Sequence, residues 1–174
     1  MRYRLAGPWS PVQPQPSIRW PPKFAPDRAP VHVRNEIDIP VARAQVWAWL
    51  VRATLWPTWY SNASHVQIDG GGPDLGPGTE FQWRTFSASL RSKVQEFVPP
   101  ERLAWDAQGS GVDVYHAWLI IPTAAGCHVL TEESQYGSLA RLDHALRPER
   151  MFQGHQRWLQ GLKEKAISGL PPSV

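Results

Sequence analysis

An amphipathic stretch close to the C-terminus, residues 148–167, sets the first condition on the fold. Its large side chains recur at intervals of four, three and four positions, so they lie on one face of an α-helix. They are Met151, His155, Trp158 and Leu162. A helix with such a face needs a large apolar surface to pack against, and the chain before it must provide that surface.

The segments before this helix alternate apolar and polar residues, which is the pattern of β-strands with one buried face. Turns rich in glycine or proline separate most of them, so successive strands are expected to pair in antiparallel fashion. Two short helical segments, 41–52 and 55–60, follow the first strand. The strands are expected at 31–39, 63–69, 79–86, 90–97, 102–107, 112–121 and 128–135. We therefore predict an α+β fold in which one curved antiparallel sheet is covered by the C-terminal helix.

Two segments are less clearly defined by their patterns. In 112–121 both alternating faces are apolar, so the pattern does not decide which face meets the helix. Residues 137–146 lead into the C-terminal helix and are expected to be partly helical themselves.

Residues 1–30 form a separate region with eight prolines, which is incompatible with the interior of a helix or a sheet. We predict an extended or disordered N-terminal arm, with a folded domain over residues 31–170. The arm lacks the continuous apolar core of a secretory signal. Trp9 and Trp20 are able to pin it to a surface, although a loose tail is the simpler interpretation.

Charge and cysteine content exclude several classes of function. The arm has five basic residues and one acidic residue, or about +4, and since the whole chain carries +3 the remainder carries about −1. The domain therefore has no basic face for nucleic acid. The glycine-rich loop at 70–78 precedes a strand rather than a helix, which favours a turn over a phosphate site. The lone Cys127 forms no internal disulfide, and a cytoplasmic protein is expected.

Residues 31–166 resemble the START-like superfamily, also called SRPBCC, and within it the polyketide cyclase/dehydrase-like proteins. The motifs that carry the resemblance are Ile37-Asp38-Ile39-Pro40 with Val46-Trp47, Trp56-Pro57-Thr58-Trp59, Leu75-Gly76-Pro77-Gly78-Thr79-Glu80-Phe81, Arg102-Leu103-Ala104-Trp105, His116-Ala117-Trp118, Glu132-Glu133-Ser134 and Leu159-Gln160-Gly161-Leu162-Lys163. The resemblance implies a helix-grip fold, in which a seven-stranded sheet wraps around the C-terminal helix and leaves a hydrophobic cavity. The superfamily has no universal catalytic residue to carry over.

The alternation of the strands also predicts which side chains line that cavity. They are mostly aromatic or aliphatic, as expected for a lipid-, polyketide- or sterol-like ligand. The predicted ligand-binding residues are Phe81, Trp83, Leu90, Val94, Trp105, Val114, Trp118, Thr131, Phe152, His155 and Leu159. No membrane-spanning segment and no cofactor are expected, and the chain is either a monomer or a homodimer.

His116 is the main candidate for chemistry, because it is a titratable group on an apolar strand face. Glu133 lies on the neighbouring strand in compatible phase and would fix the tautomer of the imidazole. The pair is able to act as acid and base on a ketone, whereas the alternative is a buried histidine that makes a structural hydrogen bond. His155 is open to the same structural interpretation. No metal is predicted, because these three residues lack the close ligand spacing of a metal motif.

Three functions are compatible with these observations. The favoured one is binding of a small hydrophobic molecule in the cavity. The second is a cyclase or dehydratase that uses His116 as acid and base. The third is a protein-interaction module that uses the proline-rich arm.

Overall fold

A computed structural model describes residues 16–173, and Trp9 lies outside them. The short 3-10 helix η1 comes first, and the helices α1 and η2 lie between the first and second strands. The bounds are η1 Pro22–Phe24, β1 Val31–Ile39, α1 Arg43–Val51, η2 Ala53–Thr58, β2 Ser64–Ile68, β3 Glu80–Thr85, β4 Ala88–Val98, β5 Arg102–Gly109, β6 Val112–Thr123, β7 Gly126–Tyr136, α2 Ser138–Leu146 and α3 Arg150–Ser168. The segment at 137–146 is thus a helix of its own.

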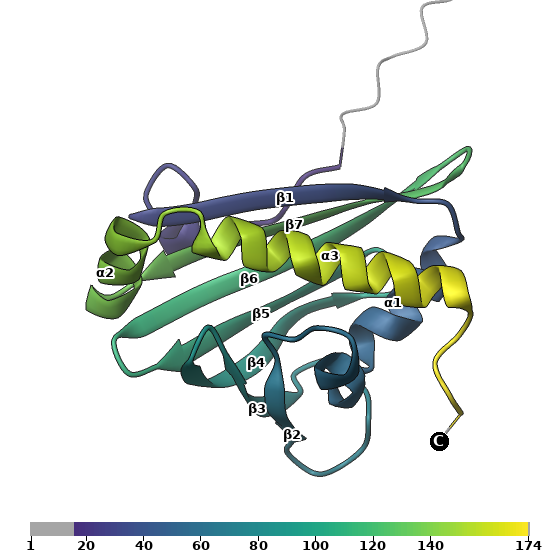
Figure 1. Cartoon of the computed structure of the whole chain (residues 1–174), viewed down its shortest axis with the longest axis horizontal. Coiled ribbons are helices and arrows are strands. Elements are labelled where there is room, and N and C mark those ends of the chain that lie inside the picture. Colours follow the sequence, from purple (N-terminus) through teal and green to yellow (C-terminus); the bar gives the residue numbers. More distant parts are fainter. Residues whose placement is uncertain (1–15, 174) are drawn as a thin grey trace, which may run out of the picture.

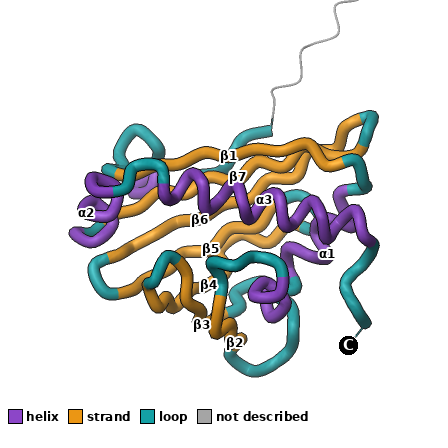
Figure 2. Tube along the Cα trace, in the orientation of Figure 1, coloured by secondary structure: helices purple, strands orange, loops and turns teal. Residues whose placement is uncertain are grey.

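The strands form one seven-stranded antiparallel sheet in the order β1-β7-β6-β5-β4-β3-β2. Strands β2 to β7 follow one another as a meander, and β1 joins the edge beside β7, so the chain's first and last strands are neighbours. The predicted α+β fold is confirmed. Figure 1 shows the sheet curving around α3, and Figure 2 shows the α-helices together on one side of the strands.

Helix α3 buries the predicted face against the sheet. Met151, His155, Trp158 and Leu162 are all buried. Two glycines allow close approach along this helix: a Cβ atom at Gly154 would lie 2.4 Å from the Phe86 ring, and one at Gly161 would lie 2.5 Å from the Trp59 carbonyl oxygen. A larger residue at Gly161 would push α3 away from the backbone of Trp59, and one at Gly154 would require the Phe86 ring to move.

The space between α3 and the middle of the sheet is filled with aromatic rings. Tyr60 stacks on Trp158 with ring centroids 4.5 Å apart, and Trp56 meets Trp158 edge to face at 5.2 Å. Trp83 and Trp105 belong to the same cluster. Such rings bury large apolar areas and are a major source of stability for this core. They also occupy the volume in which a central cavity was expected.

The outer face of the sheet is covered in part by residues 16–30, the described half of the predicted arm. Apart from η1 and a turn at 26–28, the segment has no regular secondary structure, and it packs on β6 through the stacked rings of Phe24 and Tyr115, whose centroids are 5.7 Å apart. The Tyr136 hydroxyl donates to the Lys23 carbonyl oxygen at 2.8 Å, and Arg102 Nη1 donates to the Ser17 carbonyl oxygen at 2.8 Å. These residues are therefore part of the folded unit.

This contact explains why both faces of β6 are apolar. Val114, His116 and Trp118 face α3, whereas Tyr115 and Ala117 pack in a second apolar cluster with Phe24. Each face of the strand thus meets its own partner, one formed by the core and one by the N-terminal segment.

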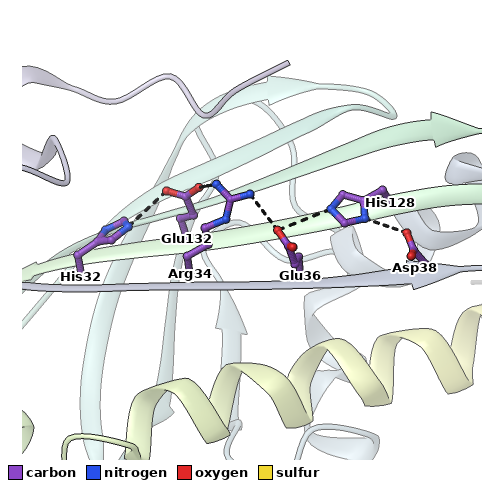
Figure 3. A network of polar contacts seen from close by, with 6 residues as sticks. All are labelled: His32, Arg34, Glu36, Asp38, His128 and Glu132. Atoms are coloured by element: carbon purple, nitrogen blue, oxygen red, sulfur yellow. Dashed lines mark hydrogen bonds and ion pairs between the residues drawn. The ribbon is translucent and has the colours of Figure 1, made fainter. Parts of the chain in front are cut away.

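The outer face along β1 and β7 carries a polar network instead (Figure 3). Arg34 bridges Glu36 at 2.9 Å and Glu132 at 3.4 Å, and His128 contacts Asp38 at 2.8 Å. We call this set the outer cluster; its members are His32, Arg34, Glu36, Asp38, His128 and Glu132. In Figure 3 they lie on the side of β1 away from α3.

Candidate functional site

A cavity of about 540 Å³ lies between the sheet and α2. Its apolar walls come from the sheet and from α2, and Met151 in the first turn of α3 closes part of it. The main apolar lining consists of Trp83, Leu90, Trp105, Val112, Val114, Leu139, Leu142 and Leu146. A volume of this size is typical of sites for small organic ligands.

The structure places only some of the predicted ligand-binding residues in this wall. Trp83, Leu90, Trp105 and Val114 line the cavity. Six others are buried in the packed interior beyond its wall: Phe81, Val94, Trp118, Thr131, His155 and Leu159. The cavity is displaced toward α2 because the aromatic cluster fills the centre.

Phe152 was predicted to face the interior, but the structure places it on the outside of α3. Its side chain is 44% exposed, and it does not line the cavity. The stripe through Met151 and His155 defines the buried face, and Phe152 lies at the edge of that stripe. Its apolar character alone was therefore a misleading signal.

The sequence reasoning missed the contribution of α2. Leu139, Leu142 and Leu146 line the cavity and remain about half exposed or more. Their spacing of three and four positions is that of one helical face, so the signal was present in the sequence. The spacing alone did not show that this face of α2 lines a cavity, because the same pattern is expected for a helix on a packed core.

Polar groups occur in two parts of the cavity wall. Glu133 and Gln135 of β7 lie on the sheet side, and Asp143, Arg147 and Arg150 lie where α2 leads into α3. Gln135 Nε2 donates to Glu133 Oε1. Glu133 stands directly opposite His116 in the pairing of β7 with β6, and His116 Nδ1 lies 2.9 Å from Glu133 Oε2. The predicted proximity of these two residues is thus present, although His116 is only 1% exposed and does not itself line the cavity.

A third residue, His155 of α3, joins this pair. Its Nε2 lies 3.4 Å from Glu133 Oε2, and its ring stacks on that of His116 with centroids 4.9 Å apart. On the far side of His116, Nε2 lies 2.7 Å from Thr131 Oγ1. We call His116, Glu133 and His155 the inner cluster. Sequence spacing does not show it, because the three residues come from β6, β7 and α3.

Burial and mutual contacts act against each other in the electrostatics of the inner cluster. It lowers the pKa of His116 below the ordinary value of 6.5, and the neighbouring Glu133 carboxylate only partly opposes this. Burial alone would raise the pKa of Glu133, but its interactions with His116 and His155 are stronger together and hold that pKa below the ordinary value. The site therefore favours an ionised carboxylate near pH 7.

Comparison with known proteins identifies the family. Residues 30–166 match the family described as polyketide cyclase / dehydrase and lipid transport, and the chain belongs to it. Its helix-grip architecture is that of the START-like, or SRPBCC, superfamily. No curated protein matches the sequence significantly.

Solved structures show the same fold. The hypothetical protein jhp0584 from Helicobacter pylori is 30% identical, with a TM-score of 0.82 over 89% of this chain and 99% of that one. The di-domain ARO/CYC StfQ of the steffimycin biosynthetic pathway is 13% identical, with a TM-score of 0.64 over 79% of this chain and 51% of that one. Ara h 8.0201 is 15% identical, with a TM-score of 0.62 over 80% and 99%.

Within residues 16–173, none of the helices combines the length and apolarity needed to cross a membrane.

Proposed function

We propose that the cavity binds a small hydrophobic molecule of lipid-, polyketide- or sterol-like character. The observation that carries this proposal is a volume of about 540 Å³ with mainly apolar walls, a polar region at Glu133 and Gln135, and charged side chains at Asp143, Arg147 and Arg150. Such a site suits a ligand with an apolar body and oxygen-bearing groups at its ends. The family's description includes both lipid transport and polyketide cyclisation, which is consistent with ligands of this class.

A filled cavity tests the proposal. Ala107 is buried in the cavity wall, and Ala107→Phe places an aromatic ring in the space that a ligand needs. Ala124 lies exposed in the turn between β6 and β7, so Ala124→Phe is a matched control outside the cavity. Binding of a fluorescent fatty acid and of a naphthol is measured by titration, and retained ligands are sought by native mass spectrometry.

We expect the parent and Ala124→Phe to bind one equivalent of at least one probe. Ala107→Phe should bind at least about 10-fold more weakly, because one blocked aromatic-sized volume removes more than about 1.4 kcal/mol of apolar contact. Near-ultraviolet circular dichroism confirms that both variants are folded. Equal binding by Ala107→Phe and the parent would contradict the proposal.

A second candidate function is acid–base catalysis of cyclisation or dehydration on a ketone held in the same cavity. The observation that favours it is the 2.9 Å contact between His116 and Glu133, since Glu133 lies in the cavity wall. In this arrangement Glu133 contacts the ligand, and His116 controls whether Glu133 is protonated. His116→Ala should then abolish turnover of a cyclisable polyketide while leaving binding intact, and unchanged turnover would eliminate this function.

The third hypothesis, an interaction module, gains no support from residues 16–30, because they pack against the sheet. The test therefore deletes only residues 1–15, so that residues 16–30 stay packed on the sheet. Unchanged binding partners after that deletion would remove the hypothesis.

A further inference from the structure

We propose that His116, Glu133 and His155 bind a divalent transition-metal ion of the Zn²⁺ type beside the cavity. This goes beyond the binding of a hydrophobic ligand and does not depend on it. The candidate ligand atoms come from three separate elements, and all lie within 4.8 Å of one another. Two imidazoles and one carboxylate are the donor set of catalytic zinc sites that keep a position open.

The separations around Glu133 suit a shared ion. Gln135 Nε2 donates to Glu133 Oε1, which leaves Oε2 to face His116 Nδ1 at 2.9 Å and His155 Nε2 at 3.4 Å. Two ligands held about 2.1 Å from one ion, at angles between a right angle and the tetrahedral angle, lie about 3.0–3.4 Å apart. The third separation, between a ring nitrogen of His116 and one of His155, is at most 4.8 Å, so binding requires these two nitrogens to move closer together.

Thr131 holds the far side of the His116 ring. Its Oγ1 lies 2.7 Å from His116 Nε2 and 3.2 Å from the Ala117 carbonyl oxygen. When Thr131 accepts from Nε2–H, the lone pair of the neutral imidazole is on Nδ1, the nitrogen that faces Glu133 Oε2 at 2.9 Å and that an ion would use. A metal-bound histidine typically donates its other ring N–H to a fixed partner, and Thr131 provides one.

His155 supplies an independent observation. It is 0% exposed, and neither of its ring nitrogens makes a hydrogen bond to any residue in the described part of the chain. Buried polar groups are nearly always satisfied, so this imidazole requires an explanation. A metal ion next to Glu133 Oε2 satisfies His155 Nε2 and the His116 lone pair together. Glu133 also lines the cavity, so the proposed ion lies directly behind the cavity wall.

The test uses the full chain, stripped of metal with a chelator and titrated with Co²⁺ and then Zn²⁺ in the absence of any hydrophobic ligand. We expect one equivalent of Co²⁺ to give visible absorption bands, which one equivalent of Zn²⁺ removes. X-ray absorption of the Zn²⁺-loaded parent should show nitrogen and oxygen ligands, with two imidazoles and no sulfur. Parent protein that binds neither ion in stoichiometric amount overturns the proposal.

Variants identify the ligands. Glu133→Gln keeps the shape of the side chain, and His155→Ala removes one imidazole; each should weaken Co²⁺ binding at least about 100-fold. Thr131→Val should weaken it about 10- to 100-fold, the range found when a supporting partner of a metal ligand is lost. His128→Ala is the matched control, because His128 contacts Asp38 at 2.8 Å on the opposite face of the sheet. Far-ultraviolet circular dichroism and urea unfolding show whether each variant is folded.

Parent-like Co²⁺ binding in folded Glu133→Gln, or loss of binding in His128→Ala alone, overturns the assignment. If His155→Ala does not fold, Glu133→Gln and the absorption spectrum of the parent still show whether the inner cluster binds the ion. If the protein binds metal but neither hydrophobic probe, the proposed function is contradicted and the metal site is supported. The reverse result would remove the metal site alone.

Discussion

The inner and outer clusters use the same residue types on opposite faces of the same sheet. Consecutive residues of β7 are divided between them: Glu132 faces outward to Arg34, and Glu133 faces inward to His116. This division follows from the alternation of side chains along a strand. The side chains of the inner cluster are at most 8% exposed, whereas those of the outer cluster, apart from Glu132, range from 23% to 85%.

The comparison teaches that burial, rather than residue identity, decides what such a cluster does. Exposed ion pairs are hydrated whether or not they meet, so each contributes little to stability. Buried groups depend on their few neighbours for every hydrogen bond, and the loss of one neighbour leaves the others uncompensated. The inner cluster is therefore able to hold a charge, a proton or an ion in a defined place, and the outer cluster mainly keeps a sheet edge polar.

The largest expected effect is the removal of the carboxylate that joins the inner cluster. Glu133→Ala should lower the free energy of unfolding by about 3–5 kcal/mol, because it empties a buried volume and leaves the ring nitrogens of His116 and His155 that face Glu133 without a polar partner. Urea unfolding measures the change, with Glu36→Ala in the outer cluster as the control. Equal losses in the two variants would contradict the distinction between the clusters.

The next largest effect tests whether covering the outer face of the sheet contributes to stability. Phe24 covers the outer face of β6 and is itself buried. Phe24→Ala should lower the free energy of unfolding by about 2–3 kcal/mol, a little below the usual range for a large core residue. Thermal unfolding measures it. A loss below about 0.5 kcal/mol would show that residues 16–30 add no stability to the outer face.

The dependence of stability on pH separates the members of the inner cluster. A pKa of His116 below its ordinary value gives a contribution that is fully present above about pH 6.5 and is lost as the pH falls below it. The corresponding contribution of Glu133 begins to fall only below about pH 4.5. Metal-free protein should therefore lose stability between pH 7 and pH 5, by at most about 1.4 kcal/mol per pH unit from one proton. His116→Gln should flatten this slope in urea unfolding, and an unchanged slope would contradict the assignment.

The smallest effect belongs to the outer cluster. Arg34 is 58% exposed and bridges Glu36 and Glu132. Arg34→Ala should change the free energy of unfolding by about 0.2–1 kcal/mol, and the difference should shrink in 1 M salt as the charges are screened. Urea unfolding at two salt concentrations measures it. A salt-independent loss of several kcal/mol would show that this network is coupled to the core.

Regular patterns predicted most of the fold. The stripe through Met151, Trp158 and Leu162 became the buried face of α3, and the alternating segments became the seven strands. The proximity of His116 and Glu133 also followed from strand phase. The docking of residues 16–30 did not, because Trp20 and Phe24 are scattered among prolines without a period that would indicate a partner.

Periodicity in the sequence determined the antiparallel α+β fold, the inward faces of most strands and the compatible phase of His116 and Glu133, because side-chain alternation acts over a few residues. The helix-grip class followed from the resemblance of the motifs to the START-like superfamily. Tertiary structure alone decided where the cavity lies and which histidine joins the pair. A cavity is the small difference between the volume that the elements enclose and the volume that side chains such as Trp56 and Trp158 fill. The position of His155 beside Glu133 likewise depends on how closely α3 approaches the sheet, which no local pattern contains.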